Sequence, residues 1–276
     1  MILAALKHGG RLVMKRTGIF YFTGTGNNMI VAEKLGDILN TQDIYPIKAL
    51  NQDKNAIGNY ERVIICAPSY HSHIPNYVEK VLKSVHFNKS QKVYSIVVCA
   101  GNRGHAIEDL RECVESNGCK VAGEYMVVLP GSYILSYGAF PDWVVKLENK
   151  ISTSKIKRIA EEIASDKSCL IKKTGLLYNS KDEARLQKAI SEYKIIGAAY
   201  SVSNSCVGCG ICEKVCPINN IILEGGKPTF GTECQQCMAC VQWCPNHAID
   251  YENKASSRKR YHHPEITVKE VIFKNR

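Results

Sequence analysis

Short apolar runs alternate with helix-period segments over the first half of the chain. The apolar runs have the length of buried strands and lie at 17–22, 43–50, 62–67, 92–100 and 121–129. Between them, apolar residues recur about every 3.6 positions, which is the period of an amphipathic helix. These helical segments are 29–39, 77–85 and 105–116. Strands that alternate with helices predict an α/β fold with a doubly wound parallel sheet of five strands.

A longer helical pattern follows the fifth predicted strand. Apolar residues recur at helical spacing from Phe140 to Ser168, which predicts an amphipathic helix that closes the first domain. A second helical pattern occupies 181–200 and fills most of a helical connector at 169–199. Because this connector has no Gly/Ser-rich tract, we expect the domain after it to be docked rather than flexibly tethered.

The connector leads into a cysteine-rich segment from Ser205 to Tyr251, which holds eight of the thirteen cysteines. The eight cysteines form two runs that each read C-x2-C-x2-C-x3-C-P. The first run is Cys206, Cys209, Cys212, Cys216 and Pro217, and the second is Cys234, Cys237, Cys240, Cys244 and Pro245. This spacing is the bacterial ferredoxin pattern for [4Fe–4S] clusters. The segment therefore resembles the two-cluster module of bacterial ferredoxins.

That resemblance implies a small α+β domain with two [4Fe–4S] clusters and crossed ligation. Three thiolates of one run reach corners of the same cubane, while the fourth, one helical turn further on, faces the other cluster. Cluster one is expected to bind Cys206, Cys209, Cys212 and Cys244. Cluster two is expected to bind Cys234, Cys237, Cys240 and Cys216.

Two other uses of cysteine fit the pattern less well. A zinc ribbon takes four ligands per metal from two C-x2-C pairs, and a repeated triple C-x2-C-x2-C with C-P does not supply that arrangement. Disulfides require an oxidising compartment, and the sequence shows no secretory signal. The other five cysteines are expected to be buried structural residues or free thiols. They are Cys66, Cys99, Cys113, Cys119 and Cys169.

A glycine-containing loop, TGTGNN, lies between the first predicted strand and the first helix, at 23–28. A strand, a glycine-rich loop and a helix N-terminus together make an anion-binding arrangement. A dinucleotide fingerprint, G-x-G-x-x-G, is excluded because Met29 stands at the third glycine. A P-loop is excluded because no lysine follows Gly26.

The loop resembles the phosphate loop of flavodoxins, T/S-x-T-G-x-T, in which hydroxyls and backbone amides hold the phosphate of FMN. Asn28 departs from the last Thr of that pattern but keeps a hydrogen-bond donor. The resemblance implies a flavodoxin-like domain at 14–168 that binds FMN. Its phosphate contacts would come from Thr23, Gly24, Thr25, Gly26, Asn27 and Asn28.

Doubly wound sheets bind ligands at the carboxyl ends of their strands, near the switch point of the strand order. The loops after the third and fourth strands are therefore expected to flank the flavin ring, as they do in flavodoxins. The first loop contains Ser69, Tyr70 and His71, with Tyr70 as the expected stacking partner of the ring. The second contains Gly101 and Asn102, which offer backbone and amide contacts to the ring edge.

The formal net charge of +10 is unevenly distributed. Residues 201–250 hold two lysines and four acidic residues, whereas the stretch from Tyr251 holds seven basic and three acidic residues. We expect a ferredoxin domain at 200–251 and a basic C-terminal tail at 252–276 with a strand-like segment at 266–273. A basic surface suits an acidic redox protein as partner, and no nucleic-acid-binding motif accompanies it.

No apolar run approaches the ~20 residues that cross a bilayer. Together with the lack of a targeting signal, this predicts a cytoplasmic protein without a membrane partner. Residues 1–13 precede Met14 and are interpreted as an N-terminal extension. The sequence leaves the oligomeric state open.

The whole layout resembles the fused flavodoxin–ferredoxin proteins of anaerobes, the EFR1-family ferredoxins, over about Lys15 to Tyr251. The resemblance implies electron transfer between FMN, two [4Fe–4S] clusters and partner redox proteins. One alternative is a flavin-dependent reductase of a small organic substrate, fed by the clusters. Its proton donor would be a histidine such as His71, with His73 and His105 as further candidates. A second alternative is a redox sensor or scaffold.

Overall fold

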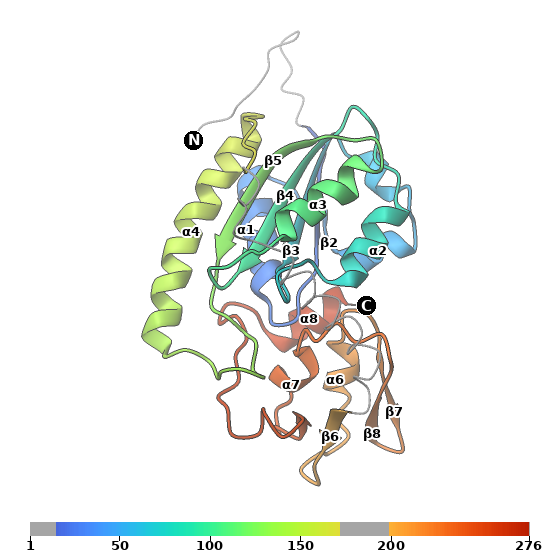
Figure 1. The fold of residues 1–276 in the computed structure, drawn as a ribbon, viewed down its shortest axis with the longest axis vertical. Helices are drawn as coiled ribbons and strands as arrows, with labels where there is room; N and C mark the ends of the chain where they lie inside the picture. Colours follow the sequence, from blue (N-terminus) through green and yellow to red (C-terminus); the bar gives the residue numbers. More distant parts are fainter. Residues whose placement is uncertain (1–14, 172–198, 276) are drawn as a thin grey trace.

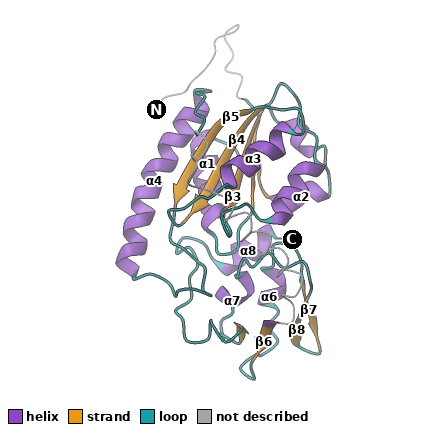
Figure 2. Cartoon of the chain, in the orientation of Figure 1, coloured by secondary structure: helices purple, strands orange, loops and turns teal. Residues whose placement is uncertain are grey.

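The computed structural model describes residues 15–171 and 199–275 of the chain. The predicted N-terminal extension and nearly all of the predicted helical connector lie outside the described residues. Figure 1 shows two modules stacked along the long axis of the molecule, a sheet with its covering helices and a smaller module below it. Figure 2 shows that the smaller module is built mostly from loops, with short helices and strands.

The larger module contains one five-stranded parallel sheet. Its strands follow in the order β2-β1-β3-β4-β5, and every neighbouring pair is parallel. This is the flavodoxin-like order of doubly wound sheets, in which the chain reverses direction across the sheet between β1 and β3. The strands are β1 (Thr17–Tyr21), β2 (Ile44–Pro46), β3 (Arg62–Pro68), β4 (Lys92–Cys99) and β5 (Val121–Val128).

Helices cover both faces of this sheet (Figure 1) because its central strands are apolar on both sides. Along β1, Ile19 and Tyr21 belong to the core on one face and Phe20 to the core on the other. The first face is covered by α1 (Asn27–Leu39) and α4 (Asp142–Ala164), and the second by α2 (Asn76–Ser84) and α3 (Ala106–Glu115). The predicted α/β class and five-stranded sheet are confirmed.

The second predicted strand is shorter than expected. β2 ends at Pro46, and the apolar residues that follow belong to a 3-10 helix, η1 (Ile47–Asn51). Another 3-10 helix, η2 (Ala56–Asn59), precedes β3. Ile47 and Leu50 are buried and lie one turn apart, on the same face of this short helix. The predicted helix at the end of the first domain is confirmed as α4.

The smaller module has the two-fold internal repeat of a ferredoxin. β6 (Tyr200–Val202) pairs antiparallel with β9 (Ile249–Tyr251), and β7 (Ile221–Glu224) pairs with β8 (Lys227–Phe230). The β7–β8 hairpin turns through Gly225 and Gly226, both at positive φ as its tight turn requires. One short helix follows the first two cysteines of each run and contains the third, α6 (Ile211–Lys214) in the first run and α7 (Ala239–Gln242) in the second.

The C-terminal segment is not a free tail, and the strand expected at 266–273 is wrong. Val268–Lys274 forms helix α8, which begins with a capping box between Thr267 and Glu270. Ile266 and Val271 are buried in the core that contains α1. Burial of such side chains stabilises by about 1.5–3 kcal/mol each, so this segment is held firmly against the larger module.

Candidate cofactor sites

The structure brings the eight cysteines of the two runs together in two groups of four. One cavity is lined by Cys206, Cys209, Cys212 and Cys244. A second cavity is lined by Cys216, Cys234, Cys237 and Cys240. Each group therefore contains three cysteines of one run and the fourth cysteine of the other, which is the crossed grouping expected from the sequence.

The local backbone explains this grouping. Helices α6 and α7 each begin after a residue in the left-handed region, Gly210 at φ 72° and Met238 at φ 58°. That conformation turns the chain from the loop with the first two cysteines into the short helix with the third, and all three line the same cavity. The fourth cysteine of each run, Cys216 or Cys244, comes after the short helix and so faces the other cavity.

Backbone N–H groups donate to several of the cysteine sulfurs, and they do so in matching places. The amide of Asn220 donates to Sγ of Cys216 at 3.2 Å, and the amide of Ala248 donates to Sγ of Cys244 at 3.3 Å. Each donor stands four residues after the sulfur that it contacts. Such bonds favour the anionic thiolate that binds iron and help to set the potential of a cluster.

Burial has the opposite effect on these thiols when no metal is bound. It raises the pKa of Cys212 to about 11, and it raises the pKa of Cys240 well above the ordinary value. Buried thiols of this kind are neutral near pH 7, and the positive charge of a metal is what deprotonates them. The donor set fits a metal cofactor.

The arrangement suits a cluster better than a single ion or disulfides. Zinc binds thiolates at about 2.3 Å, which gathers them tightly, and within 15–171 and 199–275 no three His, Cys, Asp or Glu side chains are so gathered. All thirteen cysteines lie in these ranges, and none of them forms a disulfide. Two groups of four sulfurs in apolar cavities fit two cubanes.

A third cavity, of about 220 Å³, lies at the carboxyl ends of β1, β3, β4 and β5. It is where the sheet topology places a ligand. The structure brings eight of the residues predicted for FMN to its wall. They are Thr23, Gly24, Thr25, Asn27, Asn28, Ser69, Tyr70 and His71.

The start of α1 makes one end of this cavity suitable for a phosphate group. Gly26 is at φ 94° and donates its amide to the Thr23 hydroxyl at 3.0 Å, which closes the loop. The first N–H groups of a helix have no partner within it, and they attract an anion together with the helix dipole. Among the residues that the structure describes, no Asp, Glu, Lys or Arg lines the cavity, so none of their carboxylates repels a phosphate.

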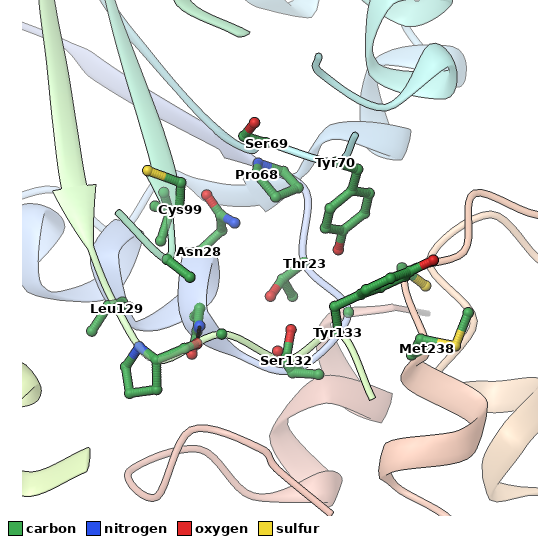
Figure 3. Close-up of a pocket in the computed structure, with 18 of the residues that line it drawn as sticks. Thr23, Asn28, Pro68, Ser69, Tyr70, Cys99, Leu129, Ser132, Tyr133 and Met238 are labelled. Atoms are coloured by element: carbon green, nitrogen blue, oxygen red, sulfur yellow. Dashed lines mark hydrogen bonds between the residues drawn. The ribbon is translucent and has the colours of Figure 1, made fainter. Parts of the chain in front are cut away.

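Asn28 adds a buried polar group to the same place. Its side-chain oxygen is buried and has no hydrogen-bond partner among the described residues. Figure 3 shows the Asn28 amide between Cys99 and Thr23, at the wall of the cavity. An unpaired buried amide costs free energy unless a ligand completes it. The unpaired oxygen accepts hydrogen bonds, so it fits a ligand that carries hydroxyl or N–H donors as well as a phosphate, such as FMN.

Aromatic side chains stand on two sides of the cavity. Tyr70 follows β3 and packs edge-on to Phe22, with ring centroids 6.4 Å apart. Figure 3 shows Tyr133 reaching from the loop after β5 toward Met238 of the smaller module. Tyr133 also packs edge-on to His71, at 5.4 Å. Two aromatic rings at one cavity suit a planar ligand.

The expected ring contacts of Gly101 and Asn102 are not found. Both residues are exposed and neither lines the cavity. The Asn102 side chain accepts a hydrogen bond from the amide of Gly104 at 3.0 Å, and Gly104 packs against the backbone of Ser72. These contacts turn the loop after β4 away from the cavity. Gly26 also lies off the wall, where its backbone shapes the loop instead.

Of the three candidate histidines, only His71 lines the cavity. Its Nε2 lies 3.1 Å from Oε1 of Gln236, a residue of the smaller module. His73 faces the carboxylate of Asp109 at 3.0 Å and stacks on His105. His73 and His105 therefore take part in packing between two loops, away from the cavity.

Two parts of the wall consist of residues that sequence reasoning did not name. One is the loop after β5, which contributes Pro130, Gly131, Ser132, Tyr133 and Tyr137. The other comes from the smaller module and contributes Gln236, Cys237 and Met238. The sequence PGSY after the fifth strand was an available signal, because the loop after every parallel strand opens at the same edge of the sheet. No local signal marks the contribution of the second module.

The phosphate-binding loop and the second cysteine run are in direct contact. A Cβ added to Gly24 would stand 2.3 Å from the backbone oxygen of Cys237, so only glycine fits there. The indole Nε1 of Trp243 donates to the Gly24 carbonyl at 2.9 Å. The two modules are thus docked at this loop, with a cysteine of the second cavity at the wall of the third.

Residues of the C-terminal segment form hydrogen bonds with the same loop, at 23–28. The amide of His263 donates to the Thr25 carbonyl at 2.8 Å, and the Tyr261 hydroxyl donates to the Asn27 side chain at 2.8 Å. Asn27 in turn donates to the Pro130 carbonyl at 3.0 Å. His262 stacks on Trp243 with ring centroids 4.3 Å apart. Residues 261–263 therefore hold the phosphate-binding loop in place.

Residues 205–249 match the sequence model of the 4Fe-4S dicluster domain. This match agrees with the two sulfur-lined cavities, so the smaller module is a dicluster ferredoxin module with eight cysteines for two clusters. No curated protein sequence matches the chain. Within the part of the chain that the structure describes, no helix is long and apolar enough to span a membrane.

Several solved flavodoxins resemble the larger module. A Fusobacterium nucleatum flavodoxin bound to flavin mononucleotide is 20% identical, with a TM-score of 0.40, and the match covers 56% of this chain and 100% of the flavodoxin. Flavodoxin 1 from Bacillus cereus is 16% identical, with a TM-score of 0.39, over 53% of this chain and 94% of its own. The fold assignment itself rests on the strand order.

Proposed function

We propose that the protein carries electrons between FMN in the third cavity and two [4Fe–4S] clusters in the smaller module. The sheet topology and the dicluster module support an electron-transfer role. FMN, when bound, exchanges one or two electrons, and each cluster exchanges one. The fused flavodoxin-like and ferredoxin modules resemble the EFR1-family ferredoxins, and we propose that the chain belongs to them.

In this proposal the chain itself supplies binding, orientation and insulation. Thr23, Thr25 and the first backbone amides of α1 hold the phosphate. The buried side-chain oxygen of Asn28 accepts a hydrogen bond from the ligand. Tyr70 and Tyr133 hold the ring. The crossed sets of four cysteines hold the clusters, with Cys206, Cys209, Cys212 and Cys244 on cluster one and Cys216, Cys234, Cys237 and Cys240 on cluster two.

The contact between Gly24 and Cys237 is the observation that carries the proposal. Gly24 belongs to the phosphate-binding loop, Cys237 is a proposed ligand of cluster two, and both line the same cavity. Electrons are exchanged efficiently only between centres that are close together. Because Gly24 has no side chain, its backbone packs directly against the backbone of Cys237. The proposed flavin site and the proposed site of cluster two are therefore adjacent.

The order of the centres follows from exposure. Cluster two lies at the flavin cavity, whereas cluster one lies beside Cys209, which is exposed, and Val207, which is 71% exposed. We propose that a partner redox protein exchanges electrons with the chain at cluster one. We also propose a cytoplasmic location, which is supported by the use of the cysteines as cluster ligands rather than in disulfides.

Anaerobic purification followed by iron, sulfide and flavin analysis tests the proposal. We expect two cubanes and one FMN per chain, and a reductive titration in which flavin absorbance and cluster signals respond together. Iron without flavin would refute the relay while leaving the ferredoxin module. Flavin without iron would refute the role of the cysteine runs.

A reductase of a small organic substrate is the second candidate, because His71 lines the flavin cavity and lies where it could deliver a proton. The hydrogen bond between His71 and Gln236 assigns the same residue a docking role instead. Substrate turnover that is lost in His71→Ala but kept in His86→Ala, a change at an exposed position, would favour the reductase.

A further inference from the structure

Three consecutive basic residues of the C-terminal segment have different surroundings. Lys259 is exposed and pairs with Asp142 at 2.7 Å on the surface. The Nη1 group of Arg258 donates to the Ile134 carbonyl at 2.6 Å. Arg260 is half-buried and turns toward the ferredoxin module. The basic run is therefore not a uniform charged surface, and Arg260 needs an explanation of its own.

Two nitrogen atoms of the half-buried Arg260 side chain leave their hydrogen-bonding capacity unused among the described residues. Its Nε and Nη1 atoms are buried and have no partner among the described residues. Its Nη2 atom makes only a long hydrogen bond, at 3.4 Å, to the Ile249 carbonyl. Because an unpaired buried donor of a charged group is costly, these two N–H groups point to an acceptor that residues 15–171 and 199–275 do not provide.

Neighbouring contacts locate Arg260 beside the first sulfur-lined cavity. Ile249, which receives the Nη2 bond, lines that cavity together with Cys244. The amide of the next residue, Tyr261, donates to Gln242 of α7 at 2.7 Å, between Cys240 and Cys244 in sequence. Arg260 is thus held between β9 and α7, at the edge of the cavity.

Asp250 is the nearest acidic candidate to balance this charge, but it is already engaged. Its carboxylate accepts from the amides of Tyr251, Ala255 and Ser256 at 2.6–2.9 Å. Burial lowers the pKa of Arg260, while Asp250, Cys244 and Cys240 raise it in that order. An arginine stays protonated in such a place, so a positive charge remains beside the cysteines.

We propose that Arg260 is a counter-charge for cluster one, with Nε–H and Nη1–H donating to a sulfur atom of that cluster. This inference rests on the proposed function, because it requires a cluster on Cys206, Cys209, Cys212 and Cys244. Reduction adds one negative charge to a cluster, and a buried cation with hydrogen bonds to sulfur stabilises the reduced form. Arg260 therefore raises the reduction potential of cluster one and draws electrons toward the exposed end of the relay.

Redox titration of the full chain, followed by the electron paramagnetic resonance of the clusters, tests this inference. Three variants are compared, namely Arg260→Gln, Arg260→Met and Arg260→Lys, with Lys259→Gln as the matched control that removes a neighbouring surface charge. We expect Arg260→Gln and Arg260→Met to lower the reduced-to-oxidised ratio of cluster one about tenfold at a fixed potential, or about 59 mV. Arg260→Lys keeps the charge and should shift the potential much less.

Iron content separates the possible outcomes. Wild-type protein without clusters would refute the proposed function itself. If the Gln and Met variants lose iron while the Lys variant keeps it, the charge is needed to retain the cluster, which supports the inference. A full complement of iron with an unchanged potential, a shift as large in Lys259→Gln, or iron loss in all three Arg260 variants would overturn it.

Discussion

The flavin cavity and the sulfur-lined cavities hold negatively charged cofactors by opposite means. The first presents neutral groups, with Thr23 and Thr25 at its wall, and no Asp, Glu, Lys or Arg of the described residues lines it. The others use buried cysteines whose pKa values burial raises, such as Cys212 and Cys240. The first kind is complete before its ligand binds, whereas the second requires iron to become charged at all.

This difference explains why the cavities depend differently on single residues. Removing one hydroxyl from the loop at 23–28 leaves other donors in place, so the affinity for FMN should fall without being lost. Removing one of four thiolates leaves an iron atom without its ligand, so a cluster is lost.

Replacing Cys216 should remove a whole cluster. Cys216→Ala takes away the ligand that the first run gives to the second cavity, so we expect loss of cluster two and of about half the iron. Iron analysis and cluster spectra measure this, with Cys169→Ala as a control because Cys169 lines neither sulfur cavity. Loss of cluster one alone would contradict the crossed grouping.

Adding a methyl group at Gly24 should separate the two modules. The new Cβ would meet the Cys237 backbone oxygen at 2.3 Å, so Gly24→Ala should cost about 1–3 kcal/mol of stability and slow the exchange of electrons between flavin and cluster two. Gly58→Ala is the control, since no atom lies within 4 Å of its added Cβ. Equal unfolding midpoints and equal transfer rates for both variants would refute the docking contact.

Acid should loosen the C-terminal segment through His263. Burial lowers the pKa of His263 to about 4, so the unfolded chain, with an ordinary pKa near 6.5, binds more protons between these values. Stability that is fully present above pH ~6.5 should therefore fall, by about 3 kcal/mol, as the pH drops toward 4. His263→Gln should reduce this dependence in thermal unfolding. An unchanged pH profile in that variant, or a change as large in His86→Gln, would contradict the assignment.

Removing the Thr25 hydroxyl should weaken the flavin cavity without destroying it. A hydrogen bond to a charged phosphate contributes roughly 1.5–3 kcal/mol, so Thr25→Ala should raise the Kd for FMN about 10- to 100-fold. Fluorescence titration of the flavin-free protein measures this, with Thr153→Ala on the exposed face of α4 as control. Unchanged affinity would remove Thr25 from the phosphate site.

The sequence predicted the cysteine groups and the sheet because each leaves a local pattern. The C-x2-C-x2-C-x3-C-P spacing determines which sulfurs share a loop, and apolar runs of strand length determine the strands. The segment at 266–273 was misassigned because Ile266, Val268 and Ile272 satisfy a strand's alternation as well as part of a helix's period. The capping box of Thr267 and Glu270 was the stronger signal.

The remaining misses concern contacts between segments far apart in sequence. Nothing local distinguishes the loop of Gly101 and Asn102 from one that faces a ligand, because its direction is set by packing of Gly104 on Ser72. The same holds for Met238 at the flavin cavity and for Arg260 beside Cys244. Contacts between segments far apart in the sequence determine where these residues lie. The hydrophobic periodicity of a segment does not predict such contacts.

The hydrogen bond from Tyr261 to Asn27 joins residues that are 234 positions apart. Synthesis on the ribosome proceeds from the N-terminus, so the sheet can form while the residues that fasten its first loop have not yet been made. The nucleotide pocket is consequently finished last, after both metal-binding runs have emerged. Completion of the earliest-made cofactor site therefore waits for nearly the entire polypeptide.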